Sequence, residues 1–212
     1  MDIITDYDKL SERSDEIDTK KENKLLREII TNLKNEVESR NLTGLAAPQL
    51  GYDKRVFVIN FKGKVVTYVN PIVTSAKNMH LSKEDCPSFP KRLFIRPRFN
   101  EIKIMFQNPM GKSQSQKLIG LAAVVFQELT DHLDGLLLPD IALEIDEMYE
   151  NASEEEQHEV LEAYLKSLDI TRKEVEDSIN NDPEAKQLQD AVNFMESVKR
   201  GETHIQIETV KR

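Results

Sequence analysis

Apolar residues recur every three or four positions in two long segments of the chain. From Lys24 to Arg40 they form a single stripe, which predicts an amphipathic helix packed on a core. From Leu118 to Leu133 they cover most sides, which predicts a helix buried in the core and ended by Gly135. Residues 1–20 are mostly polar, and we expect them to be loosely packed.

Between these two helices the apolar pattern changes to the alternation of a β-strand. Strands are predicted at residues 55–60, 64–69, 94–96 and 101–106. The first two flank Lys62-Gly63, a combination that indicates a β-hairpin. Residues 43–51 contain Pro48 and Gly51, so we predict a compact loop there rather than a continuous helix or a central strand.

The pattern changes again after Pro139. Two capping boxes and a proline at a first helical position predict helices at residues 154–167, 172–180 and 183–199. Residues 205–209 alternate in a way that fits an edge strand. The sequence therefore predicts an α+β domain at residues 1–140 and an acidic α-helical extension at residues 141–212.

Charge supports this division into two parts. The chain has a net charge of −9, but residues 141–200 hold 17 acidic and 6 basic side chains, a balance of −11. An acidic surface repels nucleic-acid phosphates and anionic lipids. We therefore expect no nucleic-acid partner and no membrane partner, and the simplest interpretation is that these charges form a solvated helix face.

The remaining composition indicates a cytoplasmic protein. No apolar run approaches the ~18 residues that a membrane helix needs, and the acidic N-terminus does not resemble a secretory signal. Cys86 is the one cysteine, so no internal disulfide can form, as is usual in reducing compartments.

Three segments carry the candidate chemistry, in the order Gly44–Gly51 (GLAAPQLG), Glu84–Pro90 (EDCPSFP) and Gly120–Gly135 (GLAAVVFQELTDHLDG). Together they resemble the three motifs of peptide deformylases, written GxGLAAxQ, EGCLS and QHExDHLxG. Val69-Asn70-Pro71 stands between the first two segments, as it does in that family. The resemblance covers about residues 24–139 and implies the peptide deformylase fold, with antiparallel sheets around a central helix.

The resemblance also implies a metal site. In the family, the second-motif cysteine and two histidines one helical turn apart hold the metal, and the glutamate beside the first histidine shuttles the proton. Cys86 and His132 match two of these ligands, whereas Glu128 stands where the first histidine belongs. Leu129 stands at the position of the proton-shuttling glutamate. The candidate metal ligands are thus Cys86, Glu128 and His132, a set that zinc accepts.

The oxyanion-stabilising groups of the family are partly present. Gln49 matches the motif-one glutamine. Pro87 follows the cysteine and has no N–H to donate. Leu42 and Asp85 replace motif glycines. Losing one oxyanion donor typically costs ~10²–10³ in rate, and losing a general acid or base costs ~10²–10⁴.

From these substitutions the sequence predicts a catalytically inactive deformylase-like protein, a pseudoenzyme with a vestigial Gln49 and no cofactor. In this interpretation, Cys86 is a small buried apolar residue and Glu128 pairs with His132. One alternative is a metal-dependent hydrolase with an altered Cys86–Glu128–His132 site that holds zinc or iron(II). Another is a residual peptide deformylase that removes formyl groups from N-formylmethionine.

An inactive protein of this kind would act as a protein-binding or structural component. The predicted partner is a protein that contacts the acidic helices, because short amphipathic helices are marginal in water and must bury their apolar stripes. A homo-oligomer or a larger assembly, including a viral particle, would provide such contacts.

Overall fold

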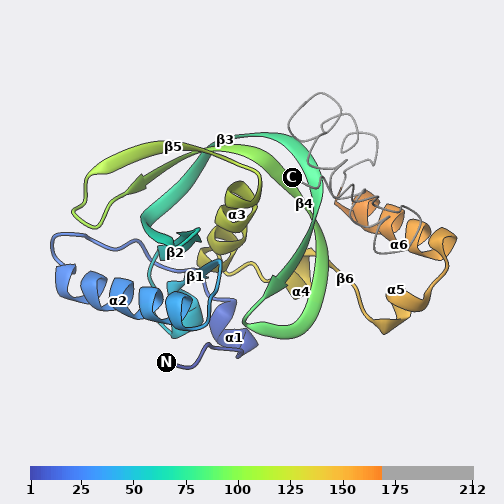
Figure 1. Cartoon of the computed structure of the whole chain (residues 1–212), viewed down its shortest axis with the longest axis horizontal. Coiled ribbons are helices and arrows are strands. Elements are labelled where there is room, and N and C mark those ends of the chain that lie inside the picture. The colour runs from blue at the N-terminus through green and yellow to red at the C-terminus, as the bar shows by residue number, and fades with distance from the viewer. Residues whose placement is uncertain (169–212) are drawn as a thin grey trace, which may run out of the picture.

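The computed structural model describes residues 1–168, which form an antiparallel sheet with a helix on each side (Figure 1). The strand order is β1-β2-β3-β4-β5, and β6 pairs with β4 at Phe94 and Ile95, on the edge opposite β3. The elements are α1 (Tyr7–Leu10), α2 (Asn23–Ser39), β1 (Gly44–Ala46), the 3-10 helix η1 (Ala47–Leu50), β2 (Val56–Phe61), β3 (Lys64–Cys86), β4 (Phe89–Gln107), β5 (Ser113–Ile119), α3 (Leu121–Leu133), α4 (Leu138–Ile141), β6 (Leu143–Glu144), α5 (Glu147–Asn151) and α6 (Glu154–Ser167). The predicted α+β architecture is confirmed.

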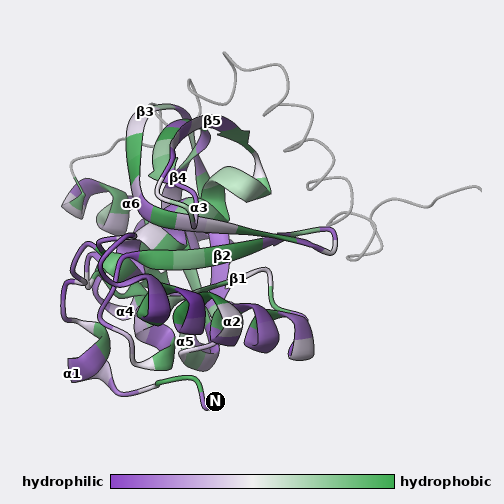
Figure 2. Cartoon of the chain, turned by 90° about the vertical axis from the view of Figure 1, so that its left-hand side faces the viewer, coloured by the Kyte–Doolittle hydropathy of each residue, from purple (hydrophilic) through white to green (hydrophobic). Residues whose placement is uncertain are grey.

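Strand β2 is buried on both faces, because α3 covers one side of the sheet and α2 the other. Phe57 and Ile59 pack with α3, whereas Val56 and Val58 pack with α2. Figure 2 shows β2 as a largely hydrophobic strand with α2 beneath it. A strand buried on two faces reads as a continuous apolar run, as VFVI does here. The predicted helix at residues 24–40 and the hairpin from 55 to 69 are therefore confirmed.

Strands β3 and β4 are much longer than the sequence predicts. They pair from Val69↔Gln107 to Cys86↔Phe89 and arch over α3 as two curved ribbons (Figure 1). Register shifts lie at Val69/Ile72 and at Glu84/Cys86, and such irregularities bend a strand pair. Polar residues between Ile72 and Cys86 interrupt the alternation of apolar and polar positions that would predict a strand. This part of β3 is kept extended by pairing with β4 rather than by burial of one face.

Two other predictions are wrong in detail. Residues 118 and 119 belong to β5 rather than to the core helix, because Gly120 at φ +62° breaks the chain direction before α3 begins. Residues 1–20 are not loose: Leu10 and Ile17 are buried, and Asn70 holds the Ile17 backbone through two side-chain hydrogen bonds of 3.0 Å. The predicted loop at residues 43–51 contains the short strand β1 and the helix η1.

The first part of the acidic extension contacts the sheet. Helix α6 matches the predicted helix at residues 154–167, and Ser153 and Glu156 form its capping box. Leu165 is buried, and the Tyr164 hydroxyl donates to the Ile141 carbonyl at 2.9 Å. The helices predicted at 172–180 and 183–199 and the strand at 205–209 lie outside the described residues. None of the helices within residues 1–168 is long and apolar enough to cross a membrane.

Candidate metal centre

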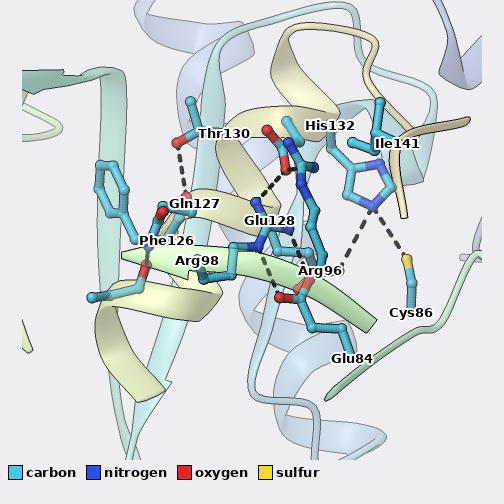
Figure 3. Close-up of polar contacts among 12 residues, drawn as sticks. Glu84, Cys86, Arg96, Arg98, Phe126, Gln127, Glu128, Thr130, His132 and Ile141 are labelled. Atoms are coloured by element: carbon cyan, nitrogen blue, oxygen red, sulfur yellow. Dashed lines mark hydrogen bonds and ion pairs between the residues drawn. The ribbon is translucent and has the colours of Figure 1, made fainter. Parts of the chain in front are cut away.

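Cys86, Glu128 and His132 converge beneath the sheet, at the end of β3 and on the inner face of α3 (Figure 3). One ligand atom from each lies within 4.8 Å of the other two. The Cys86 Sγ atom is 3.2 Å from His132 Nε2, which is 3.8 Å from Glu128 Oε1. The structure thus brings together the three residues that the sequence singled out.

Secondary structure explains this convergence. Glu128 and His132 are four residues apart on α3, so their side chains leave the helix on the same face. Cys86 is the last residue of β3 and faces Phe89 across the turn to β4. That turn leaves the backbone N–H groups of Ser88 and Phe89 free to donate hydrogen bonds to the Cys86 sulfur. Two such donors favour a thiolate.

Burial controls the protonation of all three residues. It lowers the pKa of His132 to about 4, with help from the nearby Arg98 guanidinium, so the imidazole is neutral and can bind a metal. Burial and the Glu84 carboxylate raise the pKa of Glu128 to about 8. Burial and Glu128 raise the pKa of the Cys86 thiol. Without a cation, all three groups are therefore largely uncharged at neutral pH.

A buried ion network ties the second motif to the third. The Arg98 guanidinium donates to both carboxylate oxygens of Glu84, at 2.8 and 2.7 Å, and to Asp131 Oδ2 at 2.5 Å. Arg96 donates to the same Asp131 oxygen at 2.6 Å (Figure 3). Because Glu84 is two residues before Cys86 and Asp131 directly precedes His132, this network fixes β3 against α3 at the site. Sequence reasoning missed Arg96 and Arg98: the predicted strand ended at Arg96, whereas both lie on β4, where their spacing of two places them on one face.

Gln49 is held with its amide nitrogen toward Cys86. Its Oε1 accepts from the Ala46 N–H at 2.9 Å, which leaves Nε2 to donate to the Ser88 hydroxyl at 3.2 Å and to approach Cys86 Sγ at 3.5 Å. Gln49 is 1 % exposed, and neighbouring backbone fixes its rotamer. The side chain is therefore ordered as a donor beside the metal ligands, as an oxyanion-stabilising residue requires.

The positions of Leu129 and Pro87 show what the site lacks. Leu129 is buried in the core against β2 and offers no proton-transferring group. Its Cδ1 lies 2.7 Å from where a Cβ at Gly44 would stand, so glycine is required at that position. Pro87 lines the groove next to Cys86. Residue 129 therefore adds no titratable group to the site.

A groove of about 390 Å³ opens beside Glu128. Residues 41–44 and Pro87 form its sides, and Leu121, Val124 and Val125 of α3 form an apolar wall. His80, Ser82 and Asn100 add polar groups to the lining. The groove thus combines an apolar wall with a few polar groups, the usual composition of a ligand-binding site.

The three residues fit a transition-metal ion chemically. A thiolate, a carboxylate and an imidazole are all ligands of zinc, and a set of three protein ligands leaves one position for water. The Nδ1 atom of His132 is buried and has no hydrogen-bond partner within residues 1–168, and Ile141 of α4 lies beside the ring (Figure 3). The second ring nitrogen of a metal-binding histidine is usually hydrogen-bonded. The His132 ring is therefore held less firmly than the histidine ring of a usual metal site.

Comparison with known proteins identifies the family. Residues 1–148 match the family described as polypeptide deformylase. The peptide deformylase of Thermotoga maritima is 39% identical over 98 residues, which cover 46% of this chain and 60% of that relative. The peptide deformylase of Dictyoglomus turgidum is 32% identical over 134 residues, or 63% of this chain and 84% of the relative.

Solved structures agree on the fold. The crystal structure of the Thermotoga maritima peptide deformylase superposes with a TM-score of 0.61 at 30% identity, over 66% of this chain and 95% of that one. A deformylase from the Vibrio parahaemolyticus bacteriophage VP16T, solved with actinonin, gives 0.59 at 24% identity and shows the fold alone. The chain belongs to the polypeptide deformylase family, and it spans about 60% of the length of the Thermotoga relatives that it matches in sequence.

These findings correct several predictions made from the sequence. The protein was expected to be a catalytically inactive, structural or protein-binding pseudoenzyme with a degenerate metal site and no cofactor. The family match over residues 1–148 and the convergence of Cys86, Glu128 and His132 contradict that expectation. Replacing an imidazole by a carboxylate changes one ligand but keeps a ligand at that position. The predicted protein partner and larger assembly stay predictions.

Proposed function

We propose that the chain is a metal-dependent hydrolase that removes the formyl group from N-formylmethionyl peptides. The convergence of Cys86, Glu128 and His132 beside a groove of about 390 Å³ that Glu128 lines, in a chain of the deformylase family, carries this proposal. It corresponds to a deformylase whose first histidine ligand is a glutamate. Because a thiolate ligand must stay reduced, we place the reaction in the cytoplasm.

Each residue has a role that follows from its position. Cys86, Glu128 and His132 would hold zinc or iron(II), and a bound ion of this kind supplies a water of lowered pKa. Gln49 Nε2 donates a hydrogen bond toward the oxygen that becomes negative during attack on the formyl carbon. The wall of Leu121, Val124 and Val125 binds the first side chain of the substrate.

Two substitutions predict a slow enzyme. Pro87 cannot donate the backbone N–H that a second oxyanion contact would need. Leu129 cannot carry a proton, and positioned acid–base groups typically contribute ~10²–10⁴ in rate. Gln49 and the metal-bound water remain as the sources of rate enhancement, so we expect turnover below that of relatives with the complete motifs.

The test is direct. Purified protein is loaded separately with zinc, iron(II), nickel or cobalt, and release of formate from formyl-Met-Ala-Ser is measured together with bound metal. Turnover that requires metal and disappears in Cys86→Ala supports the proposal. Stoichiometric metal without any formate release, under conditions where a Thermotoga deformylase turns over, contradicts it.

A further inference from the structure

Two clefts meet on the same short piece of β3. The groove at the metal centre and a second cleft of about 520 Å³ share Ser82 and Lys83 in their linings. The second cleft lies between the β3–β4 pair and the segment that carries α5 and α6, and Leu81, Ile95, Ile145 and Tyr149 supply its apolar lining. Ser82 and Lys83 therefore form a saddle between the metal-centre groove and this α5–α6 cleft.

Strand β3 leaves one edge open along this path. It pairs with β2 from Lys64 to Val69, but from Ile72 to Cys86 its pairing within the described residues is with β4 alone. Lys83 stands three residues before Cys86, which corresponds to about 10 Å of strand at ~3.3 Å per residue. An extended peptide advances by the same amount per residue. A substrate whose first residue lies at the metal centre would therefore reach the saddle with its third or fourth residue.

Resting on the proposed function, we propose that the α5–α6 cleft binds the downstream residues of long formyl-peptide substrates and favours apolar and basic residues there. Apolar side chains fit against Leu81, Ile95 and the Tyr149 ring. Lys83 and Glu150 balance each other within the cleft, so the preference for basic residues comes from a larger groove of about 950 Å³ that Tyr149 also lines. Glu147, Glu156 and Glu159 line that groove, and no lysine or arginine does.

Part of this subsite lies outside the family match. The family match ends at residue 148, so Tyr149, Glu150 and Gln157 lie beyond it. The contact between the extension and the sheet is specific, because β6 pairs with β4 at Phe94↔Glu144 and Arg92 binds both oxygens of Glu144 at 2.7 Å. The extension is thus held in a position where Tyr149, Glu150 and Gln157 line the α5–α6 cleft next to the saddle.

Steady-state kinetics on three peptides test the inference with the metal-loaded full chain. They are formyl-Met-Ala-Ser, the basic heptapeptide formyl-Met-Ala-Ser-Leu-Lys-Leu-Lys, and its acidic counterpart with Glu in place of Lys. We expect KM for the basic heptapeptide to be at least tenfold below that for the tripeptide, with kcat unchanged. The acidic heptapeptide should gain little or nothing.

Variants then place the effect in the cleft. Tyr149→Ala combined with Glu150→Lys should raise KM for the basic heptapeptide to the tripeptide value and leave tripeptide kinetics unchanged, which also shows that the variant is folded. Glu155→Lys is the matched control, since Glu155 is exposed and lines none of the three clefts. Equal KM values for all three peptides would overturn the inference and leave the proposed function standing. No turnover of any peptide would overturn the proposed function itself, and the inference with it.

Discussion

Glu128 stands one helical turn before His132 on α3, and its carboxylate Oε1 lies 3.8 Å from the imidazole Nε2. A carboxylate occupies the position where the family motif has a histidine, and Cys86 Sγ lies 3.2 Å from the same imidazole nitrogen. The replacement exchanges a neutral ligand for one that must lose a proton. The protonation of the site therefore limits its metal binding more than it would in a site with two histidines.

Metal affinity should rise steeply with pH. Glu128 has a pKa raised to about 8 and the Cys86 thiol has a raised pKa, so both are protonated in the metal-free protein at pH 7. His132, with a pKa lowered to about 4, needs no deprotonation. Each displaced proton changes the apparent affinity by about tenfold per pH unit below its pKa.

Competition with a chelator at pH 6, 7 and 8 measures this dependence. We expect zinc affinity to rise by about a hundredfold per unit between pH 6 and 7, where two protons are displaced. Glu128→His should halve this slope on a logarithmic scale, because only the thiol then loses a proton. An affinity that does not change from pH 6 to pH 8 would exclude Cys86 and Glu128 as ligands.

Restoring a carboxylate at residue 129 should increase activity at the expense of stability. Leu129→Glu places an acid–base group where the family motif has one, and such groups typically contribute ~10²–10⁴ in rate. The same change removes a core side chain that is 2 % exposed, which costs roughly 1.5–3 kcal/mol of apolar burial. We expect kcat for formyl-Met-Ala-Ser to rise by at least tenfold while the melting temperature falls.

Leu129→Gln is the control for this variant. Glutamine has nearly the same shape as glutamate and is also polar, but its side chain cannot transfer a proton. Leu129→Gln should therefore lower the melting temperature without raising kcat. Equal kcat values in the two variants would mean that residue 129 does not face the reacting water. The alignment of the third motif would then not describe this chain.

The sequence was sufficient to predict the α+β fold and the three residues that converge, because the motifs fix residue types at helical and strand spacings. It did not predict the length of β3, since Ser82, Lys83 and Asp85 do not alternate with apolar residues and are held extended by pairing with β4. It also missed the Arg98 network, whose partners come from a second strand and a helix. Such contacts depend on how the elements are aligned with one another, and the sequence pattern within a single element does not specify that alignment.

The functional prediction failed for a related reason. The prediction of an inactive protein rested on Leu129 and Pro87. It paired Glu128 with His132 and gave the Cys86–Glu128–His132 metal site only as an alternative. In the folded chain the Glu128 carboxylate lies with the Cys86 and His132 ligand atoms, all within 4.8 Å, and completes a set of three. Whether a replacement removes a function depends on where its own polar atoms lie, and only the structure shows that for Glu128.

Removing the Gln49 side chain should slow the reaction without releasing the metal. Its Nε2 lies 3.5 Å from Cys86 Sγ, but it is not one of the three ligands, and its rotamer is fixed by Ala46 and Ser88. A single oxyanion donor typically contributes ~10²–10³ to kcat. We therefore expect Gln49→Ala to lower kcat by about that factor, with metal content unchanged. Gln49→Glu, which keeps the size but loses the donor, should be equally slow, and a parallel loss of metal would instead assign Gln49 a structural role.

The Arg98 network should control both stability and metal binding. Arg98 is 3 % exposed and neutralises Glu84 and Asp131 together, so Arg98→Met leaves two carboxylates without their main partner. Removing one partner of a buried ion pair typically destabilises a protein by about 3–5 kcal/mol. Arg96 still contacts Asp131, so Glu84 should be the more strongly affected carboxylate. Chemical denaturation at pH 7 measures the loss, and the triple variant Arg98→Met, Glu84→Leu and Asp131→Leu should recover much of it, because no carboxylate is then left buried alone and Arg96, which loses Asp131, has a side chain that is 20 % exposed to solvent. Metal affinity separates a positioning role from general stability. If the network holds β3 against α3, the triple variant should be nearly as stable as the parent yet bind zinc more weakly. A triple variant that binds zinc as tightly as the parent would show that Cys86 and His132 stay in place without the network.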